Sequence, residues 1–227
     1  MNWKVISFYT ANYKDEVDIL IKSLDQLKIP YDIEFVKSKG LWKENTFYKI
    51  PFIIKKLKQS KTPLVWLDAD AGVVQYPVLF DDMGDALMGG VYSPWKTKGV
   101  REFISNTMYF VPCKETINFL EEINNFIKNA PDAYDHKMIG EQWYMQMVLE
   151  ANNWKERMKF RELPYTYGMA FYWKKSKLYN LCTEACVITQ RQASRRKNPI
   201  KIAYYKHLGL EINDVDEKLM MENKKEE

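Results

Sequence analysis

The sequence has few of the residues that mark several common classes of protein. Its 227 residues include nine glycines, three cysteines and two histidines. The glycines never fall into the spacing of a dinucleotide-binding fingerprint or a P-loop, which argues against dehydrogenases and P-loop kinases. Cys113, Cys182 and Cys186 are odd in number and lack paired CxxC spacing. We therefore expect reduced, buried thiols rather than a disulfide framework or a zinc ribbon.

Long apolar runs and a strong net charge are also missing. No uninterrupted apolar segment comes near the roughly 18 residues that a membrane-spanning helix needs. The first residues show no signal-peptide pattern, so we expect a cytosolic protein without a membrane span. Lys and Arg number 34 against 30 for Asp and Glu, a surplus too small to indicate nucleic-acid binding by itself.

Short apolar runs alternate with helical patterns over the first 70 residues. We expect strands at 4–9, 32–36 and 64–67, with a helix after the first strand and another over 46–59. Such alternation is typical of a parallel sheet with helices on both faces. The sequence therefore predicts an α/β, Rossmann-like fold.

The same patterns continue beyond residue 70. They indicate strands at 87–92 and 106–111, helices around 117–127 and 140–152, and strand-like runs at 186–189 and 202–205. The length suits one domain, which we place at residues 1–213. A tail at 214–227 follows, in which nine of fourteen residues are charged, as in solvated chain ends.

Two aspartates, one residue apart, directly follow the third strand. Asp68 and Asp70 come after Leu64–Leu67, and ligands of open α/β sheets bind at the carboxyl ends of strands. Side chains alternate along an extended chain, so both carboxylates point to one side and can jointly hold a hard divalent cation with its phosphates. Aspartate is also common in turns, but two like charges at the end of a buried strand repel unless a cation joins them.

The segment Asp68-Ala69-Asp70 resembles the DxD motif of nucleotide-sugar-dependent glycosyltransferases of the GT-A fold. The resemblance covers residues 3–210 at the level of fold and motif order. It implies a single GT-A domain with a mostly parallel sheet flanked by helices. It also implies a metal-dependent enzyme that moves a sugar from a nucleoside-diphosphate sugar, most commonly a UDP sugar, to a hydroxyl of a glycan or other acceptor. The metal is then Mn²⁺ or Mg²⁺, and all three residues of the motif lie at the donor.

Two segments upstream match the family in the expected order. Four residues end the first strand, where the family cradles the nucleotide base and ribose. They are Tyr9, Thr10, Ala11 and Asn12. Lys49 opens the helix before the DxD strand, where the family often places a cation that reaches the nucleotide sugar. An ordinary surface lysine is an equal alternative for Lys49.

A late histidine resembles the third metal ligand of several such enzymes. His207 follows the strand-like run at 202–205 and is one of only two histidines. A neutral imidazole beside two carboxylates suits Mn²⁺ better than Mg²⁺, which prefers oxygen ligands. A lone histidine is otherwise usually structural.

Two further sets of residues resemble parts of the family's substrate site. Glu141 and Gln142 open a helix and resemble an acidic-Gln pair near the donor and acceptor sugars. Glu141 could bind sugar hydroxyls or act as general base, or it could simply favour a helix start. Residues 191–201 hold five cations, among them Arg195 and Arg196. Such a loop could close on a diphosphate, or it could merely be solvated surface.

Two other functions fit parts of the pattern. A haloacid-dehalogenase-like phosphatase also uses DxD after an apolar strand, with the first aspartate as nucleophile, but normally on the first strand of its fold. A non-catalytic sugar-binding or nucleic-acid-binding module would stack ligands on aromatic residues beside the basic segment. Such a module would not need Asp68 and Asp70.

Overall fold

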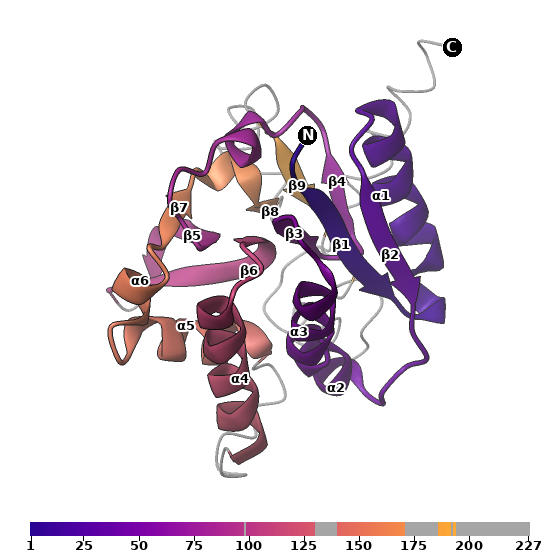
Figure 1. Cartoon of the computed structure of the whole chain (residues 1–227). Helices are drawn as coiled ribbons and strands as arrows, with labels where there is room; N and C mark the ends of the chain where they lie inside the picture. Colours follow the sequence, from indigo (N-terminus) through magenta and orange to yellow (C-terminus); the bar gives the residue numbers. More distant parts are fainter. Residues whose placement is uncertain (98, 130–139, 171–185, 192, 194–227) are drawn as a thin grey trace.

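The central feature of the fold is a six-stranded sheet with the order β2-β1-β3-β6-β5-β7 (Figure 1). The computed structural model describes residues 1–97, 99–129, 140–170, 186–191 and 193. The strands of this sheet are β1 (Lys4–Tyr9), β2 (Tyr31–Phe35), β3 (Leu64–Leu67), β5 (Met88–Thr97), β6 (Val100–Phe110) and β7 (Arg161–Leu163). β2 and β3 run parallel to β1, β6 runs antiparallel to β3 and β5, and β7 runs parallel to β5. Because only β6 of these strands is reversed, the predicted mostly parallel sheet is confirmed.

Each face of the sheet is buried under its own set of elements. Successive side chains of a strand point to opposite faces, and all four residues of β3 are buried. Leu64 and Trp66 pack with helices α3, α4 and α5, whereas Val65 and Leu67 pack with α1 and a smaller sheet. Figure 1 shows α1 on one side of the sheet and α3 and α4 on the other. The helices are α1 (Lys14–Gln26), α2 (Trp42–Phe47), α3 (Lys49–Gln59), α4 (Lys114–Asn129), α5 (Glu141–Glu150) and α6 (Trp154–Arg157).

The helix predicted over 46–59 is in fact the end of α2 followed by α3. Pro51 is the third residue of α3. Backbone N–H groups in the first helical turn have no partner within the helix, so a proline there removes no hydrogen bond. The break before α3 sets Lys49 at the amino end of a helix that packs beneath the sheet.

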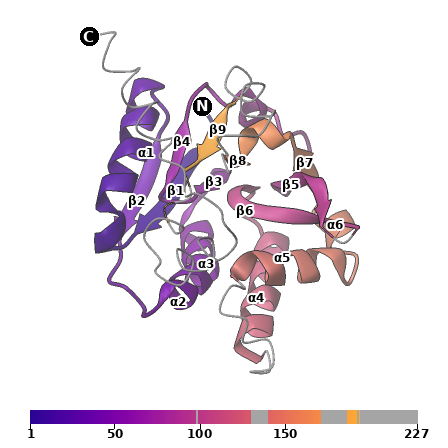
Figure 2. The ribbon, with the colours of Figure 1, turned by 180° about the vertical axis from the view of Figure 1, so that it is seen from behind.

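A smaller sheet, with the order β4-β9-β8, lies on the face that carries α1 (Figure 2). β4 (Ala71–Val73) directly follows Asp70 and pairs antiparallel with β9 (Ile188–Gln190). β9 pairs parallel with β8 (Met169–Ala170). β9 overlaps the strand-like run predicted at 186–189, while the run predicted at 202–205 lies outside the described residues.

β5 and β6 form a hairpin that is longer than the strands predicted at 87–92 and 106–111. Its pairing register shifts between Gly90 and Val91 and again between Tyr92 and Lys96. Such bulges interrupt the alternation from which a strand is recognised in a sequence. Short 3₁₀ turns connect other elements at η1 (Ala11–Tyr13), η2 (Val78–Asp81) and η4 (Tyr165–Tyr167).

No helix in the described parts of the chain is long and apolar enough to cross a membrane. Cys186 is buried, as expected, whereas Cys113 is partly exposed. Cys182 and the charged tail predicted at 214–227 lie outside the described residues.

Candidate functional site

Asp68 and Asp70 form the turn that joins the large sheet to the small one. The N–H of Asp68 donates to the carbonyl of Asn106 on β6, 3.0 Å away, which extends the pairing of β3 by one residue. The N–H of Ala71 then donates to the carbonyl of Asp68 at 2.9 Å, and the chain turns into β4. Both carboxylates therefore lie at the carboxyl edge of β3, where ligands of α/β sheets bind.

The two carboxylates have different surroundings. The Asp68 side chain is 25% exposed, whereas Asp70 is only 4% exposed. Burial and the nearby charge of Asp68 raise the pKa of Asp70 to about 6, although the N–H of Ala193 and the charge of Arg191 act to lower it. A carboxylate held in this way is favoured as an anion when a further positive charge approaches it.

Lys49 is a buried cation directly beside the DxD turn. Its side chain is 6% exposed, and its ammonium pairs with Asp68 Oδ1 at 2.8 Å and also with Glu141 Oε1. The same ammonium donates to the carbonyl and the hydroxyl of Ser105, each 3.3 Å away, and lies 5.3 Å from the ring centroid of Trp66. Burial acts to lower the pKa of Lys49, but the charges of Asp68 and Glu141 outweigh burial and raise it.

Lys49 therefore has two carboxylate partners within the protein, Asp68 and Glu141, which could not be predicted from the sequence. The family resemblance implied a cation that reaches the nucleotide sugar, with a surface lysine as an equal alternative; at 6% side-chain exposure, Lys49 is not a surface lysine. In the structure, the contacts of its ammonium join the turn after β3 to β6 and α5. The cation holds Asp68 in place from the side opposite to the small sheet.

Glu141 and Gln142 both reach Ser105 from the first turn of α5. Glu141 is 3% exposed, and its Oε1 accepts a hydrogen bond of 2.8 Å from the Ser105 hydroxyl. The N–H of Ser105 donates to Gln142 Oε1 at the longer distance of 3.4 Å. The pair predicted from the sequence is thus brought next to Lys49, and Glu141 is held by an ammonium and a hydroxyl.

Ser105 itself was not predicted as a site residue. It is one of three consecutive buried polar residues on β6, Ser105, Asn106 and Thr107. Ser105 and the Asn106 amide nitrogen have hydrogen-bond partners, whereas Asn106 Oδ1 and Thr107 Oγ1 are buried without one among the described residues. Three in a row, directly before the apolar run Met108–Phe110, is the signal by which this part of β6 could have been recognised.

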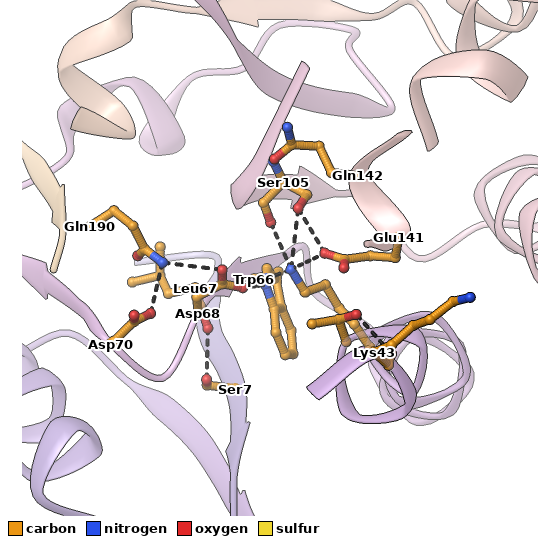
Figure 3. Close-up of polar contacts among 12 residues, drawn as sticks. Ser7, Lys43, Trp66, Leu67, Asp68, Asp70, Ser105, Glu141, Gln142 and Gln190 are labelled. Carbon is orange, nitrogen blue, oxygen red and sulfur yellow. Dashed lines mark hydrogen bonds and ion pairs between the residues drawn. The ribbon is translucent and has the colours of Figure 1, made fainter. Parts of the chain in front are cut away.

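Gln190, at the end of β9, is the second residue that the sequence reasoning missed. Its amide nitrogen lies 2.7 Å from Asp70 Oδ1 and 3.3 Å from Asp68 Oδ2 (Figure 3). The N–H of Ala193 donates to Asp70 Oδ2 at 2.6 Å, and the N–H of Arg191 donates to the Asp70 carbonyl at 3.0 Å. No local sequence pattern predicts this contact, because the pairing of β4 with β9 brings together residues that are 120 positions apart.

The four residues predicted to cradle the nucleotide base end β1 at the same edge of the sheet. Ile6 pairs with Trp66, so the end of β1 lies beside the start of the DxD turn. The Thr10 hydroxyl donates to Asn12 Oδ1 at 2.6 Å, and Ala11 opens a 3₁₀ turn. The Tyr9 ring lies 5.6 Å from the ring of Phe35, which ends β2 and is 60% exposed.

The remaining predicted residues, Arg195, Arg196 and His207, lie outside the described residues. Within the described ranges, no group of three His, Cys, Asp or Glu side chains could hold a metal ion. The two aspartates still suit a hard divalent cation. Each presents one carboxylate oxygen to the amide nitrogen of Gln190, and carboxylate oxygens are the usual ligands of such a cation. The Oε1 atom of the same amide is buried without a partner among the described residues.

Comparison of the whole chain with protein-family models finds no match, and comparison with curated proteins finds none either. Solved structures do match. A glycosyltransferase involved in the glycosylation of the major capsid of PBCV-1 has a TM-score of 0.60 and 13% identity over 87% of this chain and 97% of that one. The fold is that of a glycosyltransferase. This confirms the GT-A fold that the sequence predicted.

Two other glycosyltransferases agree with that assignment. GlyE of Streptococcus pneumoniae has a TM-score of 0.58 at 13% identity over 84% of this chain, which spans about half, 54%, of GlyE. Mouse xyloside xylosyltransferase 1 has a TM-score of 0.51 at 10% identity over 84% of this chain and 97% of that one. At these identities the likeness establishes the fold, and the chemistry must be argued from the site.

Proposed function

We propose that this chain is a metal-dependent glycosyltransferase that takes a sugar from a nucleoside-diphosphate sugar and adds it to an acceptor hydroxyl. The observation that carries the proposal is the position of Asp68 and Asp70. They stand side by side at the carboxyl edge of β3, in a fold shared with glycosyltransferases. Neither a phosphatase nor a non-catalytic module is favoured by any contact in the described residues.

Asp68 and Asp70 would hold Mn²⁺ or Mg²⁺, with His207 as a further ligand on the basis of the sequence resemblance. When bound, such a cation neutralises the charge that develops on the departing diphosphate. Arg195 and Arg196 would add charge-assisted hydrogen bonds to the same phosphates. UDP is the first nucleotide to test, because it is the commonest donor nucleotide in the family that the DxD motif resembles.

The buried polar residues would fix the donor site rather than react. Lys49 holds Asp68 Oδ1, so the orientation of that carboxylate is set before any ligand binds. Glu141 is held by Lys49 and Ser105, which places α5 against the DxD turn. Gln142, one residue further along α5, would then lie beside the sugar-binding region that the sequence resemblance implies.

The base and ribose of the donor would lie at the end of β1. Tyr9 and Phe35 present neighbouring rings at this edge, and Phe35 is largely exposed. An exposed aromatic face can stack on a nucleobase. The adjacent polar groups of Thr10 and Asn12 supply hydrogen-bonding atoms for the ribose.

Calorimetric titration of UDP and GDP, with Mn²⁺ and with EDTA, tests the proposal. We expect Mn²⁺-dependent binding of one nucleotide by the native chain. Asp70→Asn removes the charge at nearly constant volume and should weaken that binding by more than about a hundredfold, because a hydrogen-bond partner of a metal ligand alone is worth about 10–100-fold. Equal binding in EDTA and Mn²⁺, or native affinity in Asp70→Asn, would contradict the metal site.

A matched control removes another aspartate far from the site. Asp85 is 81% exposed, pairs with Lys159 at 2.9 Å, and precedes β5 at the amino edge of the sheet. Asp85→Asn should bind nucleotide like the native chain. Urea unfolding of both variants separates a lost ligand from a lost fold.

A further inference from the structure

Gln190 occupies the one point toward which both carboxylates of the DxD turn are directed. Its amide nitrogen carries two hydrogens, one for Asp70 Oδ1 at 2.7 Å and one for Asp68 Oδ2 at 3.3 Å (Figure 3). Among the described residues it is the one side chain that hydrogen-bonds to both carboxylates. An amide NH₂ group with partial positive charge thus stands where two like charges would otherwise repel.

Gln190 contacts the two carboxylate oxygens that no other described residue holds. Asp68 Oδ1 accepts hydrogen bonds from Lys49 and from the indole N–H of Trp66, each at 2.8 Å. Asp70 Oδ2 accepts from the N–H of Ala193. In the described part of the chain, this leaves Asp68 Oδ2 and Asp70 Oδ1 with Gln190 as their hydrogen-bond donor. A cation entering between the aspartates meets these two oxygens.

The other end of the same amide has no partner in the part of the chain that the structure describes. Gln190 Oε1 is buried, and no described residue donates to it. A buried amide oxygen without a donor is destabilising, because it has lost its hydrogen bonds to water. Rotation about the last side-chain bond of glutamine is soft and exchanges the positions of its nitrogen and oxygen. Amide oxygens are also ordinary ligands of hard divalent cations.

We propose that Gln190 is a placeholder for the cation: its NH₂ group bridges Asp68 and Asp70 in the metal-free chain, and on cation binding the amide turns so that Oε1 becomes a ligand. The inference rests on the proposed function, which supplies the cation. It makes Gln190 a positioning residue before binding and a metal ligand after it. The turned amide also gives a partner to the buried Oε1 atom, to which no described residue donates.

Titration with Mn²⁺ alone, without nucleotide, tests this role by calorimetry and by electron paramagnetic resonance of the bound ion. Gln190→Leu keeps the approximate volume but removes both the donor and the ligand. It should lower the melting temperature in EDTA and weaken Mn²⁺ binding by about tenfold or more. Mn²⁺ affinity equal to or greater than that of the native chain would show that the amide is a bystander or a competitor, and would overturn the proposal.

A second substitution at the same position should raise the affinity for Mn²⁺ instead of lowering it. Gln190→Glu keeps a ligand oxygen, removes the NH₂ group and sets a third carboxylate against two others. The variant should be less stable than the native chain in EDTA, bind Mn²⁺ at least about tenfold more tightly, and regain its stability on Mn²⁺ addition. Unchanged affinity in Gln190→Glu would also overturn the proposal.

The matched control for added charge is Gln59→Glu. Gln59 is exposed at the far end of α3, away from Lys49, so this variant should titrate with Mn²⁺ as the native chain does. If Gln59→Glu also bound Mn²⁺ about tenfold more tightly, the gain in Gln190→Glu would be explained by net charge alone, and the placeholder role would be overturned.

The outcomes separate this inference from the proposed function. Binding of Mn²⁺ that needs Asp70 but ignores Gln190 would overturn the placeholder and leave the transferase proposal standing. The expected Gln190 effects without any binding of UDP or GDP would support the placeholder and remove the transferase proposal. Absence of Mn²⁺ binding by the native chain would overturn both.

Discussion

Removal of the Lys49 ammonium should destabilise the protein strongly and in a pH-dependent way. Lys49→Met keeps the length and apolar stem of the side chain but deletes its charge. Glu141, at 4% side-chain exposure, then keeps only the Ser105 hydroxyl as a donor among the contacts described above. Breaking one partner out of a buried ion pair typically costs about 3–5 kcal/mol, because the remaining charge is left in a medium that solvates it poorly.

The size of the loss in unfolding free energy can also be worked out from proton uptake. A stranded buried carboxylate escapes its cost by taking up a proton. For a glutamate of ordinary pKa, about 4.3, protonation costs about 1.36 kcal/mol per pH unit above that value. This is about 3.7 kcal/mol at pH 7 and about 1 kcal/mol at pH 5. We therefore expect Lys49→Met to lose about 3–4 kcal/mol of unfolding free energy at pH 7 and far less at pH 5.

Urea unfolding at the two pH values measures this difference. The double variant Lys49→Met/Glu141→Gln should recover most of the loss at pH 7, because a neutral amide replaces the stranded carboxylate. Lys58→Met is the matched control on the same helix. Lys58 pairs with Glu121 at 2.8 Å, but both side chains are about half exposed, so its loss should cost under about 1 kcal/mol.

The reasoning is refuted if Lys49→Met costs as little as Lys58→Met at pH 7. It is also refuted if the loss is the same at pH 5 as at pH 7, since the cost would then not lie in a stranded carboxylate. A loss that Glu141→Gln does not relieve would place the cost at Asp68 instead.

Two further predictions concern parts of the fold away from the site. A hydrogen bond from the buried Lys56 ammonium lowers the pKa of Glu34, against the opposing effect of partial burial. This contribution to stability is complete above the unfolded pKa of about 4.3 and is lost as the pH falls through the folded pKa. In acid titration, the unfolding midpoint of Lys56→Met should therefore lie at a higher pH than that of the native chain. A methyl group added at Gly90 would lie 2.5 Å from the Phe103 ring in the core. One added at Gly89 would meet the flexible tip of Met83 at 2.6 Å and Tyr109 Cβ at 3.3 Å. A methionine tip can move more easily than a buried ring, so in urea unfolding Gly90→Ala should cost about 1–3 kcal/mol and Gly89→Ala less; equal losses would contradict this packing argument.

Local patterns were enough to predict the frame of the site. β1 and β3 are short apolar runs beside helical segments, so their existence could be recognised from a few neighbouring residues. Asp68 and Asp70 follow β3 immediately, so their place at the edge of the sheet followed from that strand alone. β4 and β8 were not predicted, because strands of three and two residues contain too little alternation to be seen.

The contacts that complete the site could not be predicted in the same way. Gln190 reaches Asp70 only because β9 pairs with β4, and Lys49 meets Glu141 only because α3 and α5 pack on the same face as Ser105. Each contact depends on the register of elements distant in sequence. A single sequence carries no record of such pairings, whereas the charge and polarity of the residues themselves are visible in it.

The charges gathered at the DxD turn support the proposed cation site. Asp68, Asp70 and Glu141 bring three carboxylates to the carboxyl edge of β3, and Lys49 supplies one ammonium. Arg191 does not neutralise this excess of negative charge, because its guanidinium is paired with the buried Glu16 at 2.8 Å. The described residues thus leave about two negative charges at the turn, fewer when Asp70 takes up a proton near pH 6. One divalent cation offsets that excess. Without it, a nucleoside diphosphate would meet carboxylates of its own sign, which is why we expect the cation to be needed before the nucleotide can bind.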